Sequence, residues 1–147
     1  MSKKNRSSGK ANIDRGDETL DKKDNLSTSK ITFSFVNFLG KDTKEVGQAW
    51  DEWCAKNPKM IVDLLKKFQH LGTLNTNQAK EEKSLSVYGP FPPDSKFRCP
   101  EHLKHVSTWG VIRKFSGLSR APGFYDGQGV FNIVFLDQNH EFWPSER

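Results

Sequence analysis

Cysteine and long apolar segments are both scarce in this sequence. Only Cys54 and Cys99 are present among 147 residues, so a framework of several disulfides is excluded and a reducing compartment is favoured. No apolar run approaches the roughly 18 residues of a membrane span, and the first residues lack the apolar core of a signal peptide. We therefore expect a cytoplasmic protein with no membrane segment.

Apolar residues are few as well, since 34% of the chain is hydrophobic and 28% is charged. A chain of this length and composition can bury one core, which predicts a single domain with a polar extension. The formal net charge of +5 and the pI of about 9.2 favour an anionic partner such as a nucleic acid.

The polar extension is predicted at residues 1–30. Its apolar side chains are too few to offset the cost of ordering the backbone; they are Met1, Ala11, Ile13, Leu20 and Leu26. The segment carries eight basic and five acidic residues, a net charge of +3. We predict a disordered basic tail, which either solubilises the chain or follows phosphate backbones, and a single domain over residues 31–147.

Residues 31–72 show one strand pattern and two helix patterns. Apolar residues alternate at the start of 31–39, which predicts a first strand. An Asp-Thr-Lys-Glu capping box beginning at Asp42 predicts a helix to about Cys54. Asn57 as N-cap, followed by proline, predicts a second helix that ends near Gly72.

A proline-rich stretch over 90–100 predicts a long loop after a short strand at 85–88. Cys99, His102 and His105 follow with C-x2-H-x2-H spacing. Zinc sites need four ligands, and this spacing is not that of known finger patterns, so we predict no metal site and no cofactor.

The next segments contribute three candidate site residues. A strand predicted at 108–115 places Arg113 beside Trp109 on one side, and a buried guanidinium requires an anion. That anion is either a carboxylate such as Asp137 or a bound phosphate. The following segment, SGLSRAPGFYDGQG, predicts a flexible loop that carries Arg120 and Tyr125.

The C-terminal sequence VFNIVFLDQNHEFWPSER predicts a β-hairpin with strands at 130–137 and 140–143. Such a hairpin places Asp137 opposite His140. The pair is either a catalytic dyad, in which the carboxylate orients the imidazole, or a surface hydrogen bond that closes the hairpin.

Assembled, these elements predict an α+β fold: a two-layer sandwich of strand, helix and helix followed by a three- to four-stranded antiparallel sheet. This order, the small size and the basic charge resemble the RelE/ParE superfamily of toxins over roughly residues 31–143. Ribonuclease members of that superfamily cut messenger RNA on the ribosome from a sheet surface lined with Arg, Lys, His and Tyr. The C-terminal pattern of Leu-Asp, two residues, His and an aromatic-Pro also resembles a family of uncharacterised bacterial proteins, often found on mobile elements.

The toxin resemblance implies a metal-independent endoribonuclease of a toxin–antitoxin system, with RNA or the ribosome and a cognate antitoxin as partners. In that function His140, oriented by Asp137, transfers protons. Arg113 and Arg120 hold phosphate, and Tyr125 stacks on a base or orients a substrate oxygen. Two alternatives remain: a non-catalytic protein-binding module (an immunity protein, antitoxin or phage-encoded inhibitor) that uses an exposed aromatic sheet face, and a plain nucleic-acid-binding protein.

Overall fold

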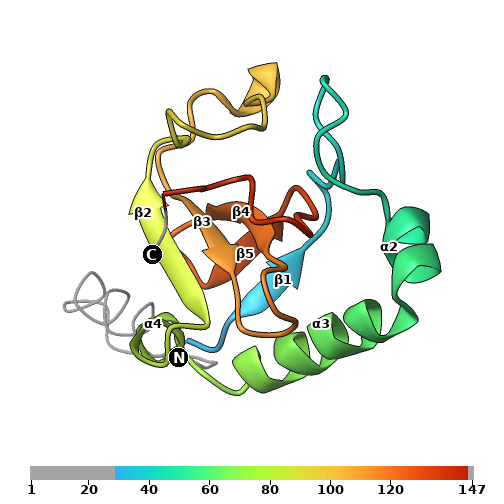
Figure 1. Cartoon of the computed structure of the whole chain (residues 1–147). Helices are drawn as coiled ribbons and strands as arrows, with labels where there is room; N and C mark the ends of the chain where they lie inside the picture. The colour runs from blue at the N-terminus through green and yellow to red at the C-terminus, as the bar shows by residue number, and fades with distance from the viewer. Residues whose placement is uncertain (1–28, 146–147) are drawn as a thin grey trace, which may run out of the picture.

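A five-stranded mixed sheet forms the centre of the molecule in a computed structural model that describes residues 29–145 (Figure 1). The strand order is β1-β5-β4-β3-β2. β1 runs parallel to β5, and the other neighbours are antiparallel. The strands are β1 (Thr32–Ser34), β2 (Leu85–Gly89), β3 (Trp109–Ile112), β4 (Ala121–Tyr125) and β5 (Val130–Ile133). The α+β class is confirmed, but the sheet has more strands than predicted and is not purely antiparallel.

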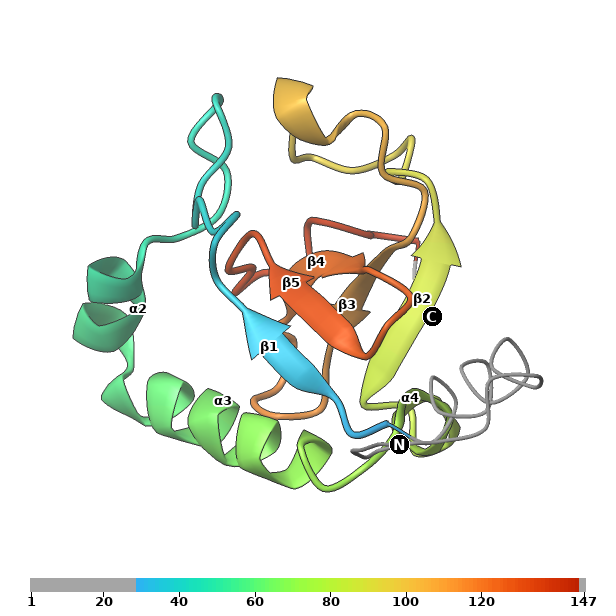
Figure 2. The same cartoon turned by 180° about the vertical axis from the view of Figure 1, so that it is seen from behind.

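Three α-helices lie between β1 and β2 in the chain (Figures 1 and 2). They are α2 (Trp50–Lys56), α3 (Pro58–Leu71) and α4 (Thr76–Glu81), and a single 3-10 turn, η1 (Glu101–Leu103), lies in the long loop after β2. The two consecutive helices were predicted, whereas α4 falls in a polar stretch without a clear apolar stripe. None of the helices in the described part of the chain is long and apolar enough to cross a membrane.

The start of α3 confirms the prediction made from Asn57 and Pro58. The Asn57 side chain accepts a hydrogen bond of 3.1 Å from the Lys59 amide. Pro58 occupies the first helical position, where its missing N–H costs nothing. The cap and the proline together fix the sharp junction between α2 and α3.

Replacing Asn57 with alanine is therefore expected to lower the free energy of unfolding by about 1 kcal/mol, because one N–H of the first turn loses its acceptor. Denaturant unfolding of the purified protein measures this. Asn77→Ala, at an exposed position of α4, is the control and should shift stability by less than about 0.5 kcal/mol. Equal effects of the two substitutions would contradict the capping role.

The helices bury their apolar sides against one face of the sheet and form the first core. Leu64 and Trp53 are fully buried there and meet Ile133 and Ile112 from the sheet. Figure 2 shows α2 and α3 running along the β1 side of the molecule, with α4 beside the start of β2. This layer agrees with the predicted packing of helices on one face.

The opposite face of the sheet is also buried, which the two-layer prediction did not include. The covering layer consists of the loop after β2 and the chain after β5, and the resulting second core contains Phe97, Leu103, Trp109, Val111, Val134, Phe135 and Phe142. The exposed aromatic sheet face assumed for the protein-binding alternative is thus covered by the chain itself. Four of these seven side chains are aromatic, which makes the contact between the sheet and its cover a substantial apolar interface.

Asp42 does not begin a helix, contrary to the capping-box prediction. Its carboxylate accepts hydrogen bonds from the amides of Lys44 at 2.8 Å and Val46 at 2.9 Å, which closes a turn in which Glu45 has φ 64°. A residue with positive φ cannot continue an α-helix. The helix starts only at Trp50, and the first strand is likewise shorter than the predicted 31–39.

The predicted flexible loop at 116–129 instead contains β4, a central strand. Pro122 and Gly123 argue against a strand from sequence alone. In the structure, a Cβ on Gly123 would lie 1.8 Å from the Asn132 carbonyl oxygen, so only glycine allows β4 and β5 to approach. The Pro122 carbonyl accepts from both Val134 and Phe135, at 2.9 and 3.1 Å, an irregularity of the kind at which proline is tolerated in a sheet.

The predicted C-terminal hairpin is also wrong, because the described chain has no strand after Ile133. Residues 135 and 137 form only isolated bridges, and the chain then turns at His140, which has φ 59°. Residues 1–28, which include nearly all of the predicted disordered tail, lie outside the described residues.

Candidate functional site

Asp137 is a buried structural residue in the turn that ends the sheet. It is 1% exposed, and its carboxylate accepts hydrogen bonds from the amides of Glu141 (2.9 Å) and Phe142 (2.8 Å). Burial raises the pKa of this carboxyl above its ordinary value, although the backbone hydrogen bonds oppose the shift. The carboxylate therefore organises the turn that carries His140.

Arg120 and Tyr125 flank or belong to β4 and hold neighbouring segments together. Arg120 is 7% exposed, and its Nη1 donates to the Ser119 carbonyl at 3.1 Å. The Tyr125 hydroxyl accepts from Thr76 Oγ1 at 2.9 Å and from the Gly129 amide at 3.1 Å. Tyr125 packs against the first core, on the face of the sheet that the helices cover.

Of the five predicted site residues, Arg120 and Asp137 meet directly, and His140 lies in the turn that the Asp137 carboxylate organises. Arg120 and Asp137 are paired through their backbones, with N–H···O distances of 2.7 and 3.0 Å. Tyr125 packs in the first core, on one side of the sheet. The Asp137 carboxylate binds the amide of Phe142, which packs in the second core on the other side. A pocket lined by residues of 39–43 and 98–104 contains none of the five residues in its lining.

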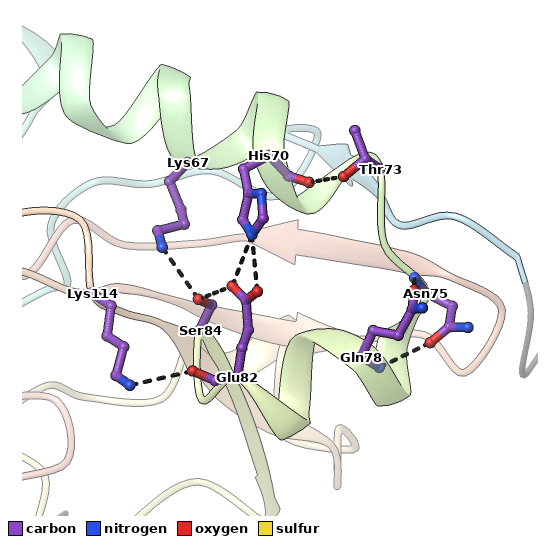
Figure 3. A network of polar contacts seen from close by, with 8 residues as sticks. All are labelled: Lys67, His70, Thr73, Asn75, Gln78, Glu82, Ser84 and Lys114. Atoms are coloured by element: carbon purple, nitrogen blue, oxygen red, sulfur yellow. Dashed lines mark hydrogen bonds and ion pairs between the residues drawn. The ribbon is translucent and has the colours of Figure 1, made fainter.

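Arg113 lies elsewhere, beside a polar network at the edge of the molecule. Its amide donates to the Ser84 carbonyl at 2.9 Å, so the chain leaving β3 is held against the chain entering β2. Close to this junction, side chains from α3, from the turn after α4 and from the turn after β3 form what we call the His70–Glu82 network (Figure 3). Its members are Lys67, His70, Glu82, Ser84 and Lys114.

Glu82 is the hub of the network. Its carboxylate lies 2.9 and 3.0 Å from His70 Nε2 and also accepts a short hydrogen bond from Ser84 Oγ. Lys67 Nζ donates to Ser84 Oγ at 3.2 Å, and Lys114 Nζ donates to the Glu82 backbone carbonyl at 3.2 Å. Figure 3 shows Lys67 and His70 both reaching from α3 towards Ser84 and the Glu82 carboxylate, and Lys114 reaching the backbone carbonyl of Glu82.

The charge state of Glu82 follows from these contacts. Burial opposes its ionisation, but the hydrogen bonds from Ser84 and His70 and the nearby positive charge of Lys67 outweigh burial and lower the pKa of the carboxyl. The side chains of His70 and Glu82 are 49% and 35% exposed. An ionised carboxylate therefore holds an imidazole that solvent and ligands can reach.

Local backbone geometry explains how these groups meet. Lys67 and His70 are three residues apart on α3 and so share one face of the helix. Lys83 and Lys114 both have φ 66°, and each marks a sharp turn, one before β2 and one after β3. Asn75 and Gln78 cap α4, which positions the turn at its end.

The sequence did not predict this network because its members are scattered along the chain and belong to no recognisable motif. Lys67 is one of several lysines of α3 and carries no signal that separates it from the others, and Glu82 and Ser84 fall in a polar stretch. Only the pairing of β2 with β3 brings Lys114 to them. No group of three or more His, Cys, Asp or Glu side chains that could hold a metal ion occurs within residues 29–145.

Comparisons with known proteins return no relatives: no protein-family model matches the chain, no curated protein matches it, and no solved structure matches it.

Proposed function

We propose that this protein is a toxin-like, metal-independent endoribonuclease that acts on messenger RNA, with the His70–Glu82 network as its reaction site. The observation that carries the proposal is a half-exposed imidazole bonded to a carboxylate at 2.9 Å, with two lysine ammonium groups in the same network. Helices cover one face of the sheet, and the loop after β2 and the chain after β5 cover the other. The proposed site is therefore at the edge of the sheet.

The network contains the groups that RNA cleavage requires. His70 Nε2 is bonded to Glu82, which leaves Nδ1 to take the proton of a ribose 2′-hydroxyl. The 2′-oxygen then bonds to phosphorus, and the bond from phosphorus to the 5′-oxygen breaks. The 5′-oxygen takes up a proton from water while the protonated imidazole later returns its proton to solvent, and the products are a 2′,3′-cyclic phosphate and a 5′-hydroxyl.

Two lysines of the network support binding of the phosphate. Lys67 and Lys114 are fixed by hydrogen bonds, so they offer positive charge at defined positions during the transition state. Arg113 precedes Lys114 and follows β3 at the same junction. The net charge of +5 favours approach of a polyanion.

The test compares three histidines. His70→Gln is expected to lower the rate of cleavage of a single-stranded RNA, measured in EDTA by gel electrophoresis, by about 100-fold or more, because the proton acceptor is lost. His102→Gln, at an exposed position of η1, is the matched control and should cleave at the wild-type rate. Thermal melting of all variants checks that the fold is kept.

Two results would contradict the proposal. Loss of cleavage in His140→Gln but not in His70→Gln would move the chemistry to the turn after Asp137. A wild-type protein that leaves RNA intact, is harmless on expression and co-purifies with a stoichiometric protein would favour the binding-module alternative.

A further inference from the structure

A pocket of about 400 Å³ lies between two loops, away from the His70–Glu82 network. Figures 1 and 2 show both loops, around 40–48 and 90–106, extending beyond the same end of the sheet. The pocket is lined by Leu39, Asp42, Thr43, Arg98, Cys99, Pro100, Glu101 and Lys104. Its volume lies within the range of sites that bind small molecules.

The pocket walls are tied together by the protein itself. The Asp42 carboxylate, which closes its own turn, also accepts a short hydrogen bond from the Arg98 amide in the other loop. Phe97, the residue before Arg98, is buried in the second core, and Leu103 anchors the far end of the same wall. The two loops are therefore held at a fixed spacing without a ligand.

The charged side chains that line the pocket differ in how many of their hydrogen-bonding atoms are already in use. The Asp42 carboxylate is occupied by three backbone amides, and Glu101 is paired with Lys104 at 3.0 Å. The guanidinium of Arg98 makes no hydrogen bond or ion pair with residues 29–145. Of the charged groups that line the pocket, Arg98 is thus the one left with its donors available for a ligand.

We propose that this pocket binds a small carboxylic acid with an apolar body. The guanidinium of Arg98 offers paired N–H donors that match the two oxygens of a carboxylate. Leu39 and Pro100 supply apolar surface for the rest of the molecule. This inference is independent of RNA cleavage.

Phenylacetate is a suitable probe, with 2-phenylethanol as its uncharged counterpart and acetate as the counterpart without an apolar body. In a titration of the ¹⁵N-labelled protein, phenylacetate is expected to shift the amide resonances of residues 39–43 and 98–104. Arg98→Gln should weaken this binding roughly tenfold or more, because a charge-assisted contact is lost. Lys96→Gln, at an exposed position two residues away that does not line the pocket, should bind as the wild type does.

Cysteine alkylation gives a second readout. Cys99 lines the pocket, whereas Cys54 is exposed on α2. Phenylacetate should therefore slow the reaction of Cys99 with iodoacetamide and leave that of Cys54 unchanged. The proposal is overturned if phenylacetate shifts no amide of the two loops, if 2-phenylethanol binds equally well, or if Arg98→Gln binds as tightly as the wild type.

Discussion

Trp109→Ala is expected to lower the free energy of unfolding by about 3–5 kcal/mol, as much as Trp53→Ala does. Both indoles are fully buried, but they belong to different cores: Trp53 lies under the helices, and Trp109 lies under the cover of the second core. Rings of Phe91, Phe124 and Phe142 surround Trp109 with centroid distances of 5.1, 5.6 and 5.9 Å. Removing the indole would leave a cavity among them.

Chemical denaturation of the two variants, followed by circular dichroism, measures these losses. Leu118→Ala serves as the control, because Leu118 is 62% exposed, and it should change stability by less than about 0.5 kcal/mol. A two-layer molecule with an open second face would lose far less from Trp109→Ala than from Trp53→Ala, so a small effect of the first substitution would refute the second core.

Asp137→Ala is expected to lower the free energy of unfolding by about 2–5 kcal/mol, because the amides of Glu141 and Phe142 each lose a buried acceptor. Asp137→Asn should cost much less, since its amide oxygen can still accept both hydrogen bonds. The order of the three proteins in a denaturant titration at neutral pH tests this. Equal losses for alanine and asparagine would mean that the turn does not depend on the acceptor.

The contribution of Asp137 to the free energy of unfolding is also expected to depend on pH. Because the folded state raises the pKa of Asp137 above 3.8, folding favours the protonated carboxyl. Its contribution to stability is complete below pH 3.8 and is lost as the pH rises through the raised pKa of the folded state. Asp137→Asn should lack this loss, so the stability difference between the variant and the wild type should move in favour of asparagine as the pH increases from about 4 towards neutrality.

Local signals predicted the parts of the fold that local interactions determine. Asn57, Pro58 and Gly72 bound a helix in the structure as they do in the sequence pattern, and at its start the N-cap acceptor and the fixed φ of proline act within one turn. The short strand at Leu85–Gly89 and the proline-rich loop after it were also predicted correctly.

Long-range contacts decided the parts that were predicted wrongly. Asp42 matches a capping box locally, but its carboxylate is used by the amide of Arg98, 56 positions away. Gly123 looks like a loop residue until the close approach of Asn132 is known. Neither the Asp42–Arg98 hydrogen bond nor the close approach of Gly123 to Asn132 can be predicted from the residues that flank them in sequence.

The His70–Glu82 network did not emerge from sequence for a related reason. Asp137 and His140 are close in sequence, and a dyad between them was the natural hypothesis. In the structure the Asp137 carboxylate accepts hydrogen bonds from backbone amides, and its orientation of His140 stays a prediction. A further carboxylate–imidazole pair occurs between His70 and Glu82, which are brought together by the turn between α3 and α4 and by α4 itself.

The parallel pairing of β1 with β5 has a consequence for how the chain reaches this state. Thr32 pairs with Val130, 98 positions later, so the edge of the sheet closes only after the intervening helices and strands have been arranged. Contacts of such long sequence separation slow folding, because the loop-closure entropy is lost before the contact is gained. During synthesis, β1 must therefore wait for β5 to emerge from the ribosome, and a general chaperone that shields Phe33 and Ile31 in that interval would raise the yield of folded protein.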